Sequence, residues 1–259
     1  MPRAASNRIQ LCGPLVVRIE GVDVTRALPG AQGRLLFAYL VTHRARQLTR
    51  GELSDLLWGD APPAQAATAL RAVLSKLRRA LAVGGRECLP PGELLRLSLA
   101  PDAWVDTEVA AQALHDAQAA VAQQEDVRAW IAAHIALNIG SRVFLPGHEN
   151  PWVFERRLEL QEIGLNSLEA LAACAVRLGG PELDTAVRAA GKLVTRAPYR
   201  ESGYGHLMRA LAAQGNAAEA LLTYERLRVR LREDLGAIPG ADLQALHAEL
   251  LDPRPSGQA

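Results

Sequence analysis

Basic side chains and no acidic one occupy the segment from Ala61 to Arg86, which carries Arg71, Lys76, Arg78, Arg79 and Arg86. Apolar residues recur there at positions 70, 73, 74, 77 and 81, the spacing of one face of a helix. The opposite face of that helix carries small and basic residues, namely Thr68, Arg71, Ala72, Ser75 and Arg79. A helix with an apolar back and such a front can dock on a domain and fit the major groove of DNA.

Side-chain length and charge predict the roles within this helix. Short side chains at Thr68, Ala72 and Ser75 let the helix approach base edges closely. We expect the residues nearest the bases to be Thr68, Arg71, Ser75 and Lys76, and those nearest the phosphates to be Arg78 and Arg79. Because Arg78 also lies close to the apolar stripe, its alternative role is to lay its aliphatic stem along the edge of the domain.

Further arginines lie outside this helix. Arg44, Arg46 and Arg50 fall between two expected helices, and Arg96 falls in an expected hairpin. Each is a candidate phosphate ligand, and a solvated loop position is the alternative. Residues 1–100 hold 14 Lys and Arg against 7 Asp and Glu, a net charge of +7, whereas residues 101–259 have a net charge of −6. The basic part is the candidate for a polyanion partner, and a chance split is the alternative.

The elements that position these residues begin near the N-terminus. Residues 9–12 and 15–20 read as short strands, and residues 20–23 read as a hairpin connection. Helical spacing follows over 33–43. Thr49-Arg50-Gly51-Glu52 is a capping-box pattern, and the helix that it opens is expected to end at Gly59. The residues that this helix is expected to bury are Leu53, Leu56, Leu57 and Trp58.

The basic helix comes next, since Pro62-Pro63 can begin a helix, and it ends near Gly84-Gly85. Residues 88–99 contain the turn signal Pro90-Pro91-Gly92 and then a strand-like alternation over 95–99. Three helices followed by a hairpin is the order of a winged helix. The second and third helices then form the helix-turn-helix, the third reads DNA, and the hairpin is the wing.

From residue 106 onward only helices are expected, at about 106–122, 125–138, 151–178, 181–196, 200–213, 217–234 and 240–251. Ala186 and Ala220 lie 34 residues apart, which is the tetratricopeptide period, and Leu193 and Leu227 repeat at the same offset. Pro198 occupies the closing position of the first unit, and the second unit is degenerate. An ordinary helical bundle with a coincidental period is the alternative.

The predicted fold class is therefore mainly α. Residues 1–102 form a winged helix-turn-helix of α+β class, residues 103–252 form an all-α tetratricopeptide-like domain, and residues 253–259 form a disordered tail.

Several strings, in this order and at these separations, resemble the SARP regulators of actinomycetes, whose winged helix is of the OmpR type. In the DNA-binding half they are Leu57-Trp58-Gly59-Asp60-Ala61-Pro62-Pro63, Leu74-Ser75-Lys76-Leu77-Arg78-Arg79-Ala80-Leu81 and Pro90-Pro91-Gly92. In the bacterial transcriptional activation domain they are Arg196-Ala197-Pro198-Tyr199-Arg200-Glu201 and the stretches 215–221 and 231–236. The resemblance covers about residues 9–251.

This resemblance implies a transcription activator that binds direct repeats in promoter DNA as a homodimer and recruits RNA polymerase through sigma and other subunits, for a biosynthetic pathway. It also implies that the loop of Asp60, Ala61, Pro62 and Pro63 faces the polymerase. The wing departs from the family, because Glu93 stands where an aromatic residue is usual, and phosphates repel its carboxylate. No G-x-x-x-x-G-K-[ST] motif is present, as in the short, two-domain members.

Other classes of function find little support in the sequence. The histidines are scattered, no nucleophile motif occurs, and we expect neither an enzyme, a metal nor a cofactor. No apolar run reaches the roughly 20 residues of a membrane span. Without a secretory signal, and with three isolated cysteines at 12, 88 and 174, we expect a cytoplasmic protein. The alternative function is a protein-interaction or ligand-sensing scaffold whose winged helix docks on protein.

Overall fold

The computed structural model describes residues 7–85 and 87–252, which group into two compact units. The first unit takes the described part of Met1–Val109 together with Arg142–Leu160, and the second takes Ala110–Ser141 together with the described part of Gln161–Ala259. Arg86 and the tail predicted at 253–259 lie outside the described residues. The predicted domain limits at residues 102 and 252 stay a prediction.

The first unit opens with a small sheet in the strand order β3-β2-β1-β6. Its strands are β1 (Arg8–Gln10), β2 (Val16–Ile19), β3 (Val22–Asp23) and β6 (Trp104–Val105), with the 3-10 turn η1 (Thr25–Ala27) after β3. The observed strands are shorter than the predicted ones. Of the connection predicted at 20–23, only Glu20 and Gly21 form the turn, and both have positive φ. A two-residue turn of this kind matches the twist of paired strands. Val22 and Asp23 therefore lie outside the turn and pair with β2.

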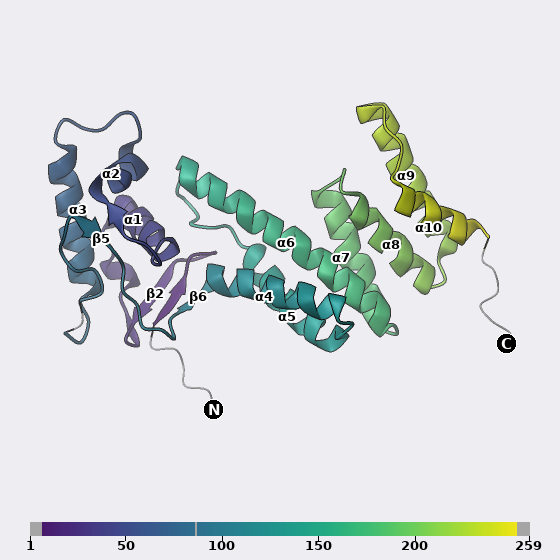
Figure 1. The fold of residues 1–259 in the computed structure, drawn as a ribbon, viewed down its shortest axis with the longest axis horizontal. Coiled ribbons are helices and arrows are strands. Elements are labelled where there is room, and N and C mark those ends of the chain that lie inside the picture. Colours follow the sequence, from purple (N-terminus) through teal and green to yellow (C-terminus); the bar gives the residue numbers. More distant parts are fainter. Residues whose placement is uncertain (1–6, 86, 253–259) are drawn as a thin grey trace. The chain divides into compact units, whose positions relative to one another are not determined.

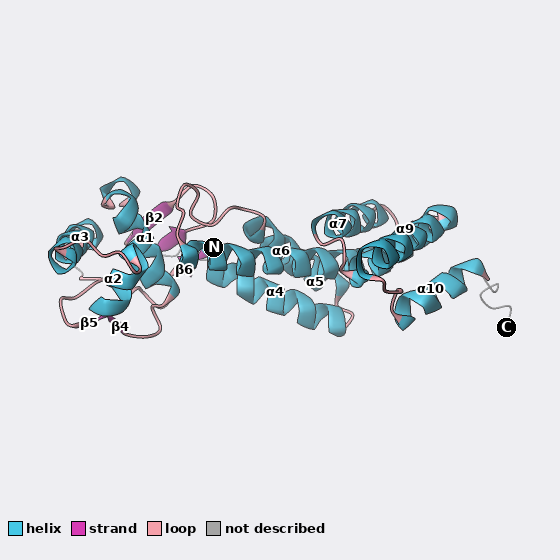
Figure 2. Ribbon diagram, turned by 90° about the horizontal axis from the view of Figure 1, so that it is seen from above, coloured by secondary structure: helices cyan, strands magenta, loops and turns pink. Residues whose placement is uncertain are grey.

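Three helices follow, as predicted: α1 (Gly30–Thr42), α2 (Arg50–Trp58) and α3 (Ala66–Leu81), seen in Figures 1 and 2. The apolar stripe of α3 is buried, since Leu70, Leu74, Leu77 and Leu81 are at most 3% exposed. In α2, Leu53 and Leu56 are buried as expected, but Leu57 and Trp58 are only half-buried. These two lie in the last turn of a nine-residue helix, where fewer neighbours cover them.

The wing differs from the predicted hairpin. Strand β5 (Leu94–Leu95) pairs antiparallel with β4 (Leu48–Thr49), the residues just before α2, and not along the preceding arm. Pro90 and Pro91 in that arm have no amide hydrogen, so they cannot donate to a ladder. The amide of Ser98 donates to the carbonyl of Cys88 at 2.8 Å and closes the base of the segment.

The second unit is helical, in close agreement with the sequence prediction. Helices α4 (Asp106–Ala122) and α6 (Pro151–Leu178) begin in the first unit and continue into the second. The others are α5 (Asp126–Gly140), α7 (Glu182–Arg196), α8 (Glu201–Ala213), α9 (Ala217–Leu235) and α10 (Ala241–Leu251). Helices α7, α8 and α9 pack side by side in chain order (Figure 1). Among the described residues, none of the helices has both the length and the apolar character of a membrane-spanning segment.

Small residues let these helices approach closely. Buried alanines such as Ala120, Ala133 and Ala190 line the core shared by α4, α5, α6 and α7. At Gly164 in α6 an added Cβ would lie 3.3 Å from the carbonyl oxygen of Gly140 at the end of α5, so the two backbones touch there. The repeated positions Ala186, Ala220, Leu193 and Leu227 are fully buried, as stacked repeats require.

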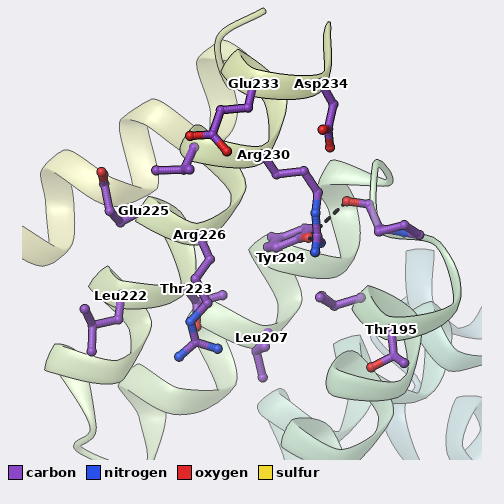
Figure 3. A pocket seen from close by; sticks show the side chains of 13 residues that line it. Thr195, Tyr204, Leu207, Leu222, Thr223, Glu225, Arg226, Arg230, Glu233 and Asp234 are labelled. Carbon is purple, nitrogen blue, oxygen red and sulfur yellow. Dashed lines mark hydrogen bonds between the residues drawn. The ribbon is translucent and has the colours of Figure 1, made fainter.

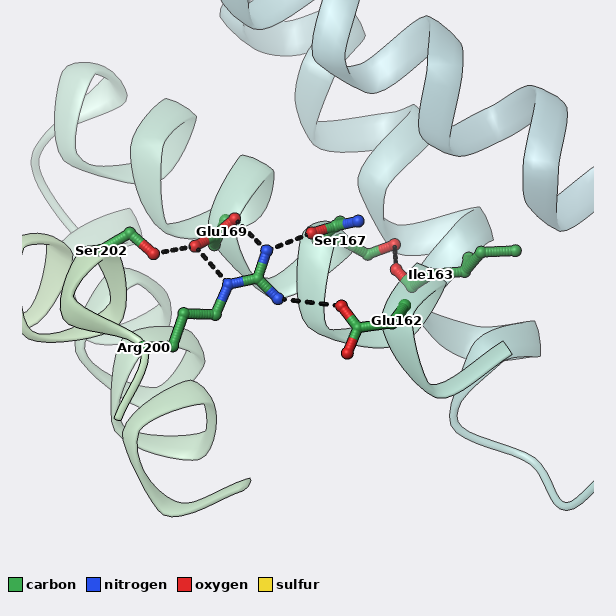
Figure 4. Close-up of polar contacts among 7 residues, drawn as sticks. Glu162, Ile163, Ser167, Glu169, Arg200 and Ser202 are labelled. Carbon is green, nitrogen blue, oxygen red and sulfur yellow. Dashed lines mark hydrogen bonds and ion pairs between the residues drawn. The ribbon is translucent and has the colours of Figure 1, made fainter. Parts of the chain in front are cut away.

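A polar cluster joins α6 to the turn between α7 and α8 (Figure 4). The Arg200 guanidinium donates to both carboxylate oxygens of Glu169, at 3.1 and 3.0 Å, and to Glu162 at 3.3 Å. It also donates to the side-chain oxygen of Asn166, and Ser202 donates to Glu169. The segment 196–201 thus includes the arginine that holds this turn on α6.

Candidate nucleic-acid interface

The front of α3 is exposed. Each residue that the sequence places there, Thr68, Arg71, Ala72, Ser75, Lys76 and Arg79, is exposed to solvent. Within the described residues, Arg71, Lys76 and Arg79 have no hydrogen bond or ion pair, and no carboxylate interrupts this face. The structure therefore leaves a cationic helix face of small and long residues open to a polyanion.

Specific residues define both ends of α2. The Glu52 amide donates to the Thr49 hydroxyl oxygen at 3.2 Å, and the Thr49 amide donates to the Glu52 carboxylate at 2.8 Å, which completes the predicted capping box. Gly59 ends the helix with φ of 53° and ψ of −133°, a conformation that favours glycine. The expected start of α3 at Pro62-Pro63 is wrong, because both prolines lie in the irregular connection after α2, and the helix begins at Ala66.

Three arginines hold the wing segment through backbone carbonyls. Arg78 Nε donates to Leu89 at 3.0 Å, Arg50 Nη2 donates to Gly92 at 2.9 Å, and Arg96 Nε donates to Arg44 at 3.1 Å. Burial, together with the charge of Arg50, lowers the pKa of Arg78. Arg78 thus takes its alternative role at the domain edge, with an Nη2 that is buried and without a partner among the described residues.

Two more of the candidate arginines are paired with carboxylates. Arg44 Nη2 lies 2.5 Å from Glu108, and Arg46 Nη1 lies 2.7 Å from Glu52. The hydrogen bond from the Thr49 amide and the Arg46 guanidinium lower the pKa of Glu52 to about 2, and Glu52 in turn raises the pKa of Arg46. The structure thus separates Arg71, Lys76 and Arg79 from the arginines at 44, 46, 50, 78 and 96, whose guanidinium groups have partners within the protein.

The loop between α2 and α3 is accessible. Asp60, Ala61, Pro62 and Pro63 are all exposed, and the Pro63 carbonyl accepts the amide of Ala66 at 2.9 Å. Glu93 in the wing is exposed as well. The loop and the front of α3 are therefore both open at the surface of the first unit.

Sequence reasoning missed a buried carboxylate that supports this unit. Asp106, 1% exposed at the start of α4, accepts the amides of Leu11 and Cys12 at 2.9 and 2.8 Å. Burial raises the pKa of Asp106 and also that of the Cys12 thiol. An acid directly after the apolar pair Trp104–Val105 was the available signal, but its partners lie more than 90 residues away.

Comparison with known proteins identifies the family to which this chain belongs. Residues 105–251, more than half of the chain, match the model of the bacterial transcriptional activator domain. The regulatory protein AfsR of Streptomyces coelicolor is 31% identical over 249 residues, which cover 96% of this chain and 24% of AfsR. The regulatory protein DnrI of Streptomyces peucetius is 28% identical, over 94% of this chain and 92% of DnrI.

A solved structure agrees in fold. Mycobacterium tuberculosis EmbR, in a complex with a low affinity phosphopeptide, superposes with a TM-score of 0.81 at 24% identity. The match covers 97% of this chain and 66% of the EmbR chain. This chain spans about a quarter of the length of AfsR. The domain match and these relatives show that the chain belongs to the SARP family of transcriptional regulators, with a bacterial transcriptional activator domain at residues 105–251.

Proposed function

We propose that this protein is a sequence-specific DNA-binding transcription activator, with α3 as its reading helix. The observation that carries the proposal is the exposed, acid-free front of α3. Arg71, Lys76 and Arg79 supply cations without competing partners, and Thr68, Ala72 and Ser75 are short enough for the backbone to approach base edges.

The proposed division of contacts takes into account which arginines have partners within the protein. Arg79 takes a phosphate, while Arg71 and Lys76 lie nearer to the bases. Arg78 acts from inside the protein, because its Nε donates to Leu89 and holds the wing. Arg44 and Arg46 are less available to DNA phosphates, because each guanidinium group already pairs with a carboxylate. Arg44 lies 2.5 Å from Glu108, and Arg46 lies 2.7 Å from Glu52.

We further propose that two copies bind direct repeats together and bring RNA polymerase to the promoter through the exposed loop 60–63. A candidate surface for pairing lies on α5, where Val127, Ile131 and Ile135 are 65, 56 and 43% exposed. Their i, i+4, i+8 spacing forms one stripe, which lines a groove of about 640 Å³ between α4 and α5. An exposed apolar stripe of this kind marks an interaction surface.

The direct test is a footprint of the purified chain on promoter fragments recovered by chromatin immunoprecipitation. In the footprint we expect two adjacent protected repeats with sharp boundaries. In a transcription assay with polymerase holoenzyme, we expect more transcript with the chain than without it. The variant Lys76→Ala should lose the protection, while Arg188→Ala, which changes an exposed arginine on α7, should keep it. Uniform coverage of all DNA, or unchanged protection by Lys76→Ala, contradicts the assignment.

The pairing surface has its own test. Ile131→Asp places a charge in the middle of the α5 stripe, so we expect it to shift the light-scattering mass on promoter DNA from two copies to one. Binding of two copies by this variant, with unchanged affinity, contradicts the α5 surface and leaves the α3 assignment intact.

A further inference from the structure

An open groove runs along α9 in the second unit, with walls from α7 and a floor from α8 (Figure 3). Its volume is about 860 Å³. Apolar side chains, among them Val194, Leu207 and Leu222, form much of its surface, and Leu222 is 57% exposed. The groove therefore offers a large apolar surface that the described chain does not cover.

Two guanidinium groups reach into this groove. Arg226 and Arg230 lie one turn apart on α9, and their guanidinium groups lie apart from each other, that of Arg230 at Tyr204 and that of Arg226 beside Thr223 (Figure 3). Arg230 Nη1 donates to the hydroxyl oxygen of Tyr204 at 2.7 Å, and that hydroxyl donates to the Pro198 carbonyl at 3.0 Å. Tyr204 is 2% exposed, so a buried residue fixes where the Arg230 guanidinium lies. Among the described residues Arg226 has no hydrogen bond or ion pair.

The carboxylates at the rim are engaged elsewhere. Glu225 pairs with Arg228 at 2.5 Å, and Glu233 lies 3.6 Å from Arg232. Asp234 accepts the Tyr199 hydroxyl at 3.1 Å. Because these acids have other partners, Arg226 and Arg230 remain two cations above an apolar floor without an anion of their own. A ligand that complements this arrangement carries a carboxylate next to apolar groups.

We propose that this groove binds an extended peptide segment of a partner protein, with one Asp or Glu side chain at Arg226, a second at Arg230, and flanking apolar side chains on Leu207 and Leu222. An extended segment fits because the groove is open, so both ends of the segment can leave into solvent. A carboxylate at either guanidinium group gains charge-assisted hydrogen bonds. This interaction does not depend on the DNA-binding assignment.

The test uses fluorescence anisotropy with the full chain and three fluorescein-labelled nine-residue peptides. The first has a central Asp-Glu pair flanked by leucines, the second replaces the acids by lysines, and the third replaces the leucines by serines. We expect saturable binding of the first peptide only. Binding of the lysine peptide with equal affinity, or no binding of any of the three, overturns the proposal.

Variants then locate the binding site. Arg226→Glu reverses an exposed charge without a partner, so we expect an unchanged thermal midpoint and a loss of peptide affinity of about tenfold or more. Arg230→Lys keeps a cation and should lose less. The matched control Arg188→Ala, on the same unit but away from the groove, should bind as the original chain does. Equal affinity for Arg226→Glu and the original chain contradicts this site, whatever the outcome on DNA.

Discussion

Arg78 Nε donates to the carbonyl oxygen of Leu89 at 3.0 Å, whereas its neighbour Arg79 points a guanidinium into solvent without a partner among the described residues. Two adjacent arginines thus have different tasks: one anchors the wing segment, and the other is available to a ligand. Helical geometry causes the difference, because a step of about 100° turns one residue toward the domain edge and the next away from it.

Substitution of the two arginines should therefore separate stability from DNA binding. Arg78→Ala removes a hydrogen bond from a half-buried donor, so we expect a loss of about 1 kcal/mol in the free energy of unfolding. Arg79→Ala should leave that free energy within about 0.5 kcal/mol of the original value. Urea denaturation followed by circular dichroism measures both. Equal losses for the two variants would show that Arg78 does not hold the wing.

The capping box at the start of α2 should be worth a measurable amount of stability. Thr49→Ala leaves the Glu52 amide without its acceptor, and we expect a loss of about 1 kcal/mol in the free energy of unfolding. Thr68→Ala is the matched control, because Thr68 is exposed on the front of α3 and caps no helix. A smaller effect at Thr49 than at Thr68 is the outcome that this interpretation does not allow.

Glu52 should make stability depend on pH in the acid range. Its pKa is lowered to about 2 in the folded protein, so the folded state holds the carboxylate charged while the unfolded state binds a proton first. The stabilisation is full above the ordinary pKa of Glu and is lost as pH falls toward about 2. The difference in stability between the original chain and Glu52→Gln should thus be largest near neutral pH and shrink on acidification. A difference that stays constant from about pH 7 to about pH 3 argues against this linkage.

The Arg200 cluster should stabilise the second unit (Figure 4). Arg200 is 29% exposed and Glu169 22%, so solvent screens the pair only in part. We expect Arg200→Ala to cost about 1–2 kcal/mol, and Arg200→Lys to recover little, because an ammonium cannot donate to both oxygens of Glu169 in the same planar geometry. Arg228→Ala, which removes an exposed pair within α9, is the control and should cost far less. Hydrogen exchange of the α8 amides measures the effect, and faster exchange in the control than in Arg200→Ala would contradict it.

Local patterns predicted the elements well. The leucines of α3 are buried at the predicted spacing. The helix limits predicted between residues 122 and 241 agree with the observed limits to within about two residues. Such signals are local, since periodicity and caps act over a few residues. The sequence also placed Thr68, Arg71 and Ser75 together on one exposed face.

Contacts between distant segments were beyond these patterns. Strand β6 has two residues and no periodicity, yet it pairs in parallel with β1, almost 100 residues earlier. Helical spacing places Arg78 closer to the apolar stripe than Arg79, but it does not reveal that the acceptor of Arg78 is the carbonyl of Leu89 in the wing. The wing was misread because its pairing partner is Leu48–Thr49, which lies before α2 and carries no strand signal of its own.

The salt dependence of DNA binding tests the α3 assignment most directly. The measurement is the slope of log Kobs against log salt concentration on promoter DNA for the original chain and for the Lys76→Ala, Arg79→Ala double variant. If these side chains neutralise phosphates or lie against the bases, affinity falls, and the slope flattens by about one unit for each phosphate contact removed. Unchanged affinity and an unchanged slope in the double variant would contradict the account.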